Sequence, residues 1–189
     1  DWMPRTHPLT LPGGRILLPL YSDGFNASLV AISDDDGDTW RASRPIIGLG
    51  PIQPSLAKRR DGTIIAFCRD SGPPPGRVMA SLSRDNGETW SAARDTDIPN
   101  PGSSLEVIVL RDGRWLIVHN DSTQSRDSLT VAISEDEGKT WPLKRRLEPQ
   151  SDGATSFSYP SVIQSADGAV HITYTCKGPR GGRIRHGIL

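Results

Sequence analysis

The residues of this chain that could do chemistry recur at one place in a repeated pattern, shortly before a turn glycine. The turn glycines are Gly14, Gly62, Gly113 and Gly168. The residues nine positions before them are Arg5, Gln53, Ser104 and Tyr159, and those seven positions before them are His7, Ser55, Glu106 and Ser161. Residues two apart in a strand share a face, and polar groups there are costly unless they meet water or a ligand. We therefore expect Arg5, His7, Gln53, Glu106 and Tyr159 to face one central pocket.

An eight-residue motif that occurs three times marks the strands that would position these residues. It reads Ser-x-Asp-x-Gly-x-Thr-Trp at 33–40, 83–90 and 134–141, so its tryptophans lie 50 and 51 residues apart. A fixed period of this size indicates a repeat architecture. In the motif we expect the Asp to accept backbone hydrogen bonds, the Gly to take a positive φ and the indole to pack on the sheet. A calcium loop does not fit, because Ile32 would stand at its first ligand position and Ser43 at its last.

Each repeat contains an apolar strand, a glycine turn, a second apolar strand, a third strand that leads into the motif and a fourth strand after it. We expect four such units, at approximately residues 5–48, 52–98, 103–149 and 158–189, and the last ends after its third strand. No segment has helical periodicity. Four-stranded units of this length are typical of a β-propeller. We therefore predict an all-β chain that forms the C-terminal portion of a propeller, about four of six blades, with a second copy of the chain as an alternative way to close the ring.

The composition bears on the partners of the chain. Its 22 Lys and Arg residues balance 22 Asp and Glu residues, which argues against nucleic acid or a membrane surface as partner. No run of 18 apolar residues suggests a membrane span. The start at Asp1-Trp2-Met3 suggests a fragment or a processed form. Cys68 and Cys176 are expected to be unpaired packing residues, and the histidines lack metal-ligand spacing, so neither a metal nor a cofactor is expected.

The repeated motif resembles the Asp-box of sialidases and related propellers, where it is structural and lies away from the active site. Three further segments resemble the later blades of bacterial sialidases. Ile52–Asp70 is similar to the blade with a catalytic Glu and the second arginine of the sialidase triad, which makes Arg69 the arginine and puts Gln53 where the Glu belongs. Arg126–Val131 resembles the strand that the third arginine leads, and Ser158–Val162 resembles the segment with the nucleophilic tyrosine.

The resemblance implies a sialidase-like exo-glycosidase that hydrolyses terminal sialic acid or a related acidic sugar, with Tyr159 as nucleophile. Arg69 and Arg126 would bind the substrate carboxylate through their guanidinium forks. A tyrosine avoids the repulsion that a carboxylate nucleophile would meet beside that group. Because Gln53 cannot act as a base, we expect Glu106 to take the proton of Tyr159, with Gln53 and His7 as substrate-binding residues.

The resemblance also places the first triad arginine and the acid/base aspartate outside this chain, so the chain alone is not expected to hydrolyse sialosides. Family resemblance favours a secreted or periplasmic location. Two other functions stay open. One is another acidic-sugar hydrolase or lyase that uses Tyr159 and His7 as acid and base, an option that Gln53 favours. The other is a carbohydrate-binding or interaction propeller without turnover, since a fold by itself does not decide function.

Overall fold

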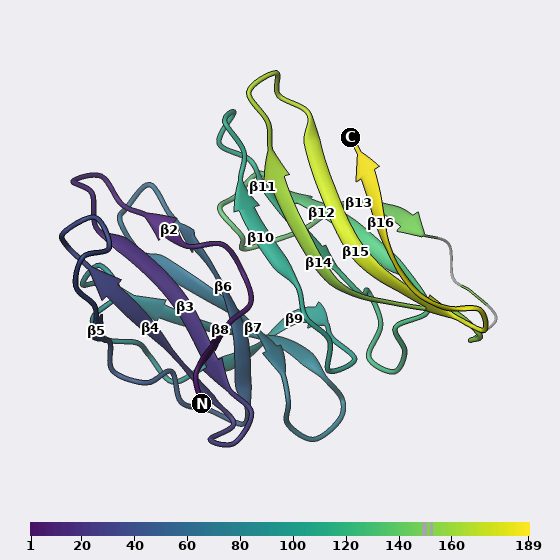
Figure 1. Ribbon diagram of the computed structural model, residues 1–189, viewed down its shortest axis with the longest axis horizontal. Coiled ribbons are helices and arrows are strands. Elements are labelled where there is room, and N and C mark those ends of the chain that lie inside the picture. Colours follow the sequence, from purple (N-terminus) through teal and green to yellow (C-terminus); the bar gives the residue numbers. More distant parts are fainter. Residues whose placement is uncertain (149–150, 152) are drawn as a thin grey trace. The chain divides into compact units, whose positions relative to one another are not determined.

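The fold is built from β-strands throughout the part of the chain that the structure describes. This computed structural model describes residues 1–148, 151 and 153–189. Within those ranges the chain forms sixteen strands and no helix (Figure 1), and so no helix that could cross a membrane. The predicted all-β class is confirmed. The strands pair in four sheets, and the chain divides into two compact units, residues 1–73 with 78–97 and residues 74–77 with 98–189.

The first sheet lies in the first unit. Its strands are β1 (Met3–Pro4), β2 (Leu9–Thr10), β3 (Ile16–Ser22), β4 (Ala27–Ser33) and β5 (Arg41–Ala42). Both β1 and β2 pair with β3, in the registers Met3↔Tyr21 and Leu9↔Leu17. The opening strand of the first repeat is therefore divided into β1 and β2, and the residues between them include Pro8, which has no N–H to offer a continuous ladder.

The second sheet belongs almost wholly to the same unit. Its strands are β6 (Pro51–Lys58), β7 (Ile64–Asp70), β8 (Arg77–Ser83) and β9 (Arg94–Pro99). One hydrophobic core joins it to the first sheet and includes Leu17, Ile32, Ile64 and Cys68. The second Asp-box packs closely on this core, because a Cβ at Gly87 would lie 2.9 Å from Leu17. Gly87 also has a φ of 92°, so glycine is required there for both space and backbone conformation.

The third and fourth sheets form the second unit. The third contains β10 (Glu106–Val109), β11 (Trp115–His119), β12 (Leu129–Ser134) and β13 (Leu143–Glu148). The fourth contains β14 (Ser156–Gln164), β15 (Val170–Gly178) and β16 (Gly181–Ile188), three neighbouring arrows coloured green to yellow in Figure 1. Leu116, Phe157, Ile172 and Cys176 lie in their shared core. Cys68 and Cys176 are both buried free thiols, which confirms the prediction that they serve packing.

The three Asp-boxes share one hydrogen-bonded turn. In the first, the Asp35 carboxylate accepts bonds from Ser33 Oγ at 2.8 Å and from Thr39 N at 2.9 Å. Asp85 and Asp136 accept the equivalent bonds. Threonine donors therefore lower the pKa of Asp35 and of Asp136 to about 2. The predicted packing of the indole on the sheet is wrong for Trp40, which is 45% exposed. Its Nε1 instead donates to Gly37 O at 2.9 Å, so this ring folds back over its own turn.

Candidate functional site

A bulge in β6 holds Gln53, one of the predicted pocket residues. The register between β6 and β7 shifts between Ile52 and Ser55, and Gln53 has a φ of 53° immediately before Pro54. A positive φ is rare for a residue with a long side chain, and a residue before proline is normally extended, so this backbone is strained. Gln53 is 3% exposed, and within the described residues its Oε1 has no hydrogen-bond partner. Because such a buried acceptor is costly, Gln53 is a candidate ligand-binding group.

Two other predicted residues lie around the same bulge in the first unit. Arg69 pairs with Ile52 across β6 and β7. Its side chain is half-buried, and its Nε finds no hydrogen-bond partner in the described ranges. The exposed His7 follows Thr6, whose Oγ1 donates to Pro54 O at 2.7 Å. The structure therefore brings the backbone of Arg69 and of the segment containing His7 to the bulge that contains Gln53.

The predicted nucleophile Tyr159 occupies a matching bulge in β14 of the second unit. The register between β14 and β15 shifts between Ser158 and Ser161. Tyr159 has a φ of 54° and precedes Pro160. Its side chain is bulky, which makes this conformation a clear outlier. Tyr159 is 43% exposed, so a solute can reach its side chain.

The predicted base Glu106 is fastened to the strand that contains Tyr159. Glu106 stands at the start of β10 and is 1% exposed. Its Oε2 accepts a hydrogen bond from Val162 N at 2.7 Å. Val162 lies three residues after Tyr159 on β14. A buried carboxylate needs such donors, and here the donor is the backbone of the strand that it would have to serve.

The predicted carboxylate-binding Arg126 is fastened to the same strand from the other side of Tyr159. The carbonyl oxygen of Arg126 accepts a bond from Phe157 N at 2.7 Å. Its guanidinium Nη2 donates to Gly102 O at 2.6 Å, which ties the side chain to the loop before β10. The structure thus brings three predicted residues of the second unit, Tyr159, Glu106 and Arg126, to one stretch of β14.

Sequence reasoning missed Asn120, which holds this stretch together. Asn120 is fully buried, its Oδ1 accepts from Ser103 Oγ at 2.6 Å, and its Nδ2 donates to Ser128 O at 2.6 Å and to Phe157 O at 3.1 Å. One side chain therefore joins the loops before β10 and β12 to β14. A signal was available, because Asn120 stands seven residues after Gly113, as Arg69 stands seven residues after Gly62.

Ser104 extends the pattern of the two bulges. It occupies the same repeat position as Gln53 and Tyr159, nine residues before a turn glycine. Ser104 is 1% exposed, and its Oγ lacks a hydrogen-bond partner in the described part of the chain. Since buried hydroxyls normally find partners, Ser104 is a further candidate residue for the site of the second unit.

The comparison with known families agrees with this repeat pattern. The profile of the BNR repeat-like domain matches residues 3–172. This chain belongs to the BNR repeat-like domain family. The sialidase of Micromonospora viridifaciens is 30% identical to it over 152 residues, which cover 75% of this chain and 22% of that protein. The BNR repeat-like domain described here therefore spans less than a quarter of the length of that relative.

Solved structures show the same fold. A protein of unknown function from Dyadobacter fermentans superposes with a TM-score of 0.76 at 22% identity, over 100% of this chain and 53% of that one. A leech intramolecular trans-sialidase superposes with a TM-score of 0.75 at 20% identity, over 95% of this chain and 30% of that one. The predicted sialidase-type β-propeller fold of this BNR repeat-like domain is confirmed, and the total number of blades stays a prediction.

Proposed function

We propose that this domain is the nucleophile-bearing part of a sialidase-type exo-glycosidase that hydrolyses the bond to a terminal acidic sugar. One observation carries the proposal: the strained, exposed Tyr159 lies on β14 between Phe157, which bonds to Arg126, and Val162, which bonds to Glu106. Strained backbone that the surroundings hold in place is typical of functional sites. The sialidase named among the relatives supports the same reaction class. Because the chain spans only part of that relative, the activity of the whole protein is part of the proposal.

In the proposed reaction the phenol oxygen of Tyr159 attacks the anomeric carbon while the bond to the leaving oxygen breaks. The phenol proton passes to the Glu106 carboxylate, and water later releases the sugar from the tyrosine. Arg126 offers a guanidinium fork for the carboxylate of the sugar. A neutral tyrosine suits this substrate, since a carboxylate nucleophile would be repelled by the sugar's own carboxylate. The protonation of the leaving oxygen is not assigned to any residue of this chain.

The first-unit residues have substrate-binding roles in the proposal. Arg69 is a guanidinium for a carboxylate, Gln53 an amide for polar groups of the sugar, and His7 a lining group. The buried Oε1 of Gln53 supports a binding role, because a substrate donor would satisfy it. Gln53 has no proton-accepting carboxylate, which is why the base in this proposal is Glu106.

The proposal is tested with the full-length protein and two substrates, a fluorogenic sialoside and uronate-containing oligosaccharides. Release of the free acidic sugar, together with a sugar adduct on the peptide that contains Tyr159 after acid quench, supports the proposal. An unsaturated product that absorbs in the ultraviolet would replace it with a lyase, the alternative that Gln53 favours. Binding of either sugar without any product would replace it with a carbohydrate-binding propeller.

A further inference from the structure

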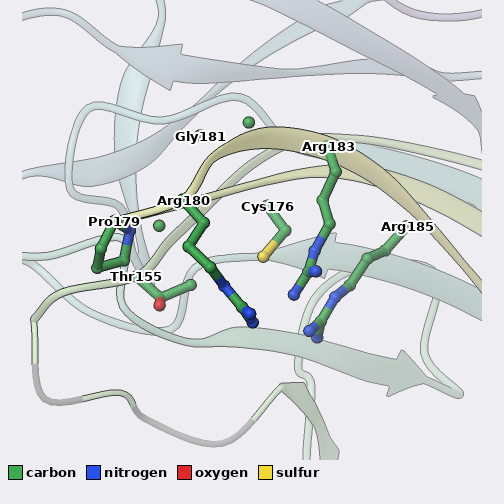
Figure 2. Close-up of a pocket in the computed structure, with 9 residues that line it drawn as sticks. Thr155, Cys176, Pro179, Arg180, Gly181, Arg183 and Arg185 are labelled. Atoms are coloured by element: carbon green, nitrogen blue, oxygen red, sulfur yellow. The ribbon is translucent and has the colours of Figure 1, made fainter.

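A small basic pocket lies beside the hairpin that joins β15 to β16. The cavity has a volume of about 180 Å³, and its lining includes Thr155, Cys176, Arg180, Arg183 and Arg185. Figure 2 shows the guanidinium ends of the three arginines extending to the same side of the hairpin, with the Cys176 sulfur pointing the same way. None of these residues belongs to the candidate site around Tyr159.

One of the three arginines is already neutralised. Arg185 forms an ion pair with Glu148, and the Tyr174 hydroxyl donates to the same carboxylate oxygen at 2.7 Å. Burial and this carboxylate raise the pKa of Tyr174 to about 12. Glu148 thus bonds to both Tyr174 and Arg185, and of these three residues Arg185 lines the pocket.

The other two arginines have no such partner. Across residues 1–148, 151 and 153–189, neither Arg180 nor Arg183 has an ion pair or a side-chain hydrogen bond. Both are exposed, yet they extend toward the same cavity (Figure 2). Two like charges that converge repel each other, and an anion placed between them makes the total electrostatic energy of the three groups favourable. Guanidinium forks fit carboxylate and sulfate groups in particular.

The register of the fourth sheet relates this pocket to Tyr159. Phe157 lies opposite Cys176, and Cys176 lies opposite Arg183. Tyr159 is two residues from Phe157 along β14. Neighbouring strands are about 4.8 Å apart, so the backbone of Arg183 lies about 10 Å from that of Phe157. The pocket and the candidate nucleophile therefore occupy the same end of one sheet.

We infer that the Arg180–Arg183 pocket is a second anion subsite, which binds the carboxylate of another acidic sugar in the same oligosaccharide. The presence of an acidic sugar at Tyr159 rests on the proposed function. The anion-binding property of the pocket rests only on the unpaired Arg180 and Arg183. It predicts a preference for oligosaccharides with two acidic residues over those with one. Arg183 supplies a planar fork, and Arg180 adds a second charge from the turn.

The test compares the dissociation constants of a two-acid and a one-acid oligosaccharide by titration calorimetry with the full-length protein. The variants are Arg183→Gln and Arg180→Gln, both exposed positions where glutamine costs little stability. Lys177→Gln is the matched control, because it also removes one positive charge from an exposed residue of this hairpin. Lys177 directly follows Cys176 on β15, so its side chain lies on the opposite face of the sheet from the pocket. We expect the two-acid sugar to bind at least about tenfold tighter in the wild type and in the control, and either arginine variant to lose that preference.

Three results would overturn the inference: no preference in the wild type, a preference that survives both arginine substitutions, or binding of inorganic sulfate to the pocket without any preference between the two sugars. Hydrolysis is measured in parallel. A wild type that binds with the predicted preference but releases no sugar would refute the proposed function and leave the pocket standing. A wild type that hydrolyses both sugars but binds them with equal affinity would support the proposed function and refute the second anion subsite.

Discussion

Gln53 and Tyr159 share one rare backbone conformation in two different sheets. Each has a positive φ, 53° and 54°, each precedes a proline, and each stands in a bulge of the first strand of its sheet. The β6 and β14 strands therefore share a backbone conformation at this position, although the side chain of Gln53 is buried and that of Tyr159 is 43% exposed. The bulge is a repeated device that re-aims a side chain, and the repeats differ in what they place on it.

Replacing Gln53 by glycine should stabilise the protein. Glycine takes this φ without strain, and the substitution also removes a buried oxygen that lacks a partner, so we expect a gain of about 1 kcal/mol in the free energy of unfolding. Urea denaturation measures it. Gln53→Ala is the control, because it removes the amide and keeps the strain, and it should gain less. Equal stability of the two variants would show that the backbone there is not strained.

Replacing Tyr159 by phenylalanine should abolish hydrolysis of the acidic sugar while the protein stays folded. The substitution removes only the hydroxyl of a side chain that is 43% exposed, and loss of a nucleophile typically costs at least about a thousandfold in kcat. Steady-state kinetics and thermal unfolding are measured together. Tyr21→Phe, at a half-buried tyrosine of β3, is the control and should keep its activity. A Tyr159→Phe enzyme that retained wild-type kcat would exclude the tyrosine as nucleophile.

Replacing Glu106 by glutamine should separate its structural role from its chemical one. An amide oxygen can still accept the bond from Val162 N, so stability should change by less than about 1 kcal/mol. The loss of the base should lower kcat by roughly a hundredfold or more. Glu106→Ala removes the acceptor as well and should cost about 1–3 kcal/mol in unfolding free energy. Intact hydrolysis in the glutamine variant would assign Glu106 to structure alone.

Replacing Asn120 by alanine should loosen the stretch of β14 around Tyr159. The change deletes three hydrogen bonds and leaves Ser103 Oγ, Ser128 O and Phe157 O without this partner in a buried place. We expect a loss on the order of 3 kcal/mol in unfolding free energy. Because Asn120 acts through the position of β14, kcat should fall more than KM rises. Gln124→Ala, at an exposed position of the following loop, should leave both quantities unchanged, and an unchanged kcat in Asn120→Ala would rule out the positioning role.

The buried His119 should make the protein less stable in mild acid. Burial lowers its pKa to about 4 in the folded protein from an ordinary value of 6.5. The stabilising effect is therefore complete above about pH 6.5 and is lost as the pH falls through that value toward 4, by roughly 3 kcal/mol in total. Urea unfolding at several pH values measures this slope. The first repeat has a leucine, Leu20, at the position equivalent to His119, six residues after its turn glycine. His119→Leu therefore introduces a residue type that the repeat already accepts there, and it should flatten the slope. An unchanged slope would place the titrating group elsewhere.

Much of the fold could be predicted from local patterns. The Asp-boxes, the turn glycines and the apolar strands are short-range features, and the structure has strands on both sides of each turn glycine and before each Asp-box. The break between β1 and β2 in the opening strand could not be predicted, because both short strands depend on their pairing with β3. The candidate site was predicted as a set of residue types. What each side chain bonds to could not be predicted, since Glu106 and Val162 are 56 residues apart.

The sequence by itself determined the repeat, the all-β class and the places where polar side chains enter the strands, because each of these follows from periodicity and turn chemistry over a few residues. Only the tertiary structure decided that Gln53 and Tyr159 stand in strained bulges, that Asn120 joins three segments, and that Arg180 and Arg183 converge on a cavity. These features arise from the register between strands that are distant in the chain. Register depends on packing and hydrogen bonding across a whole sheet, which no local stretch of residues encodes.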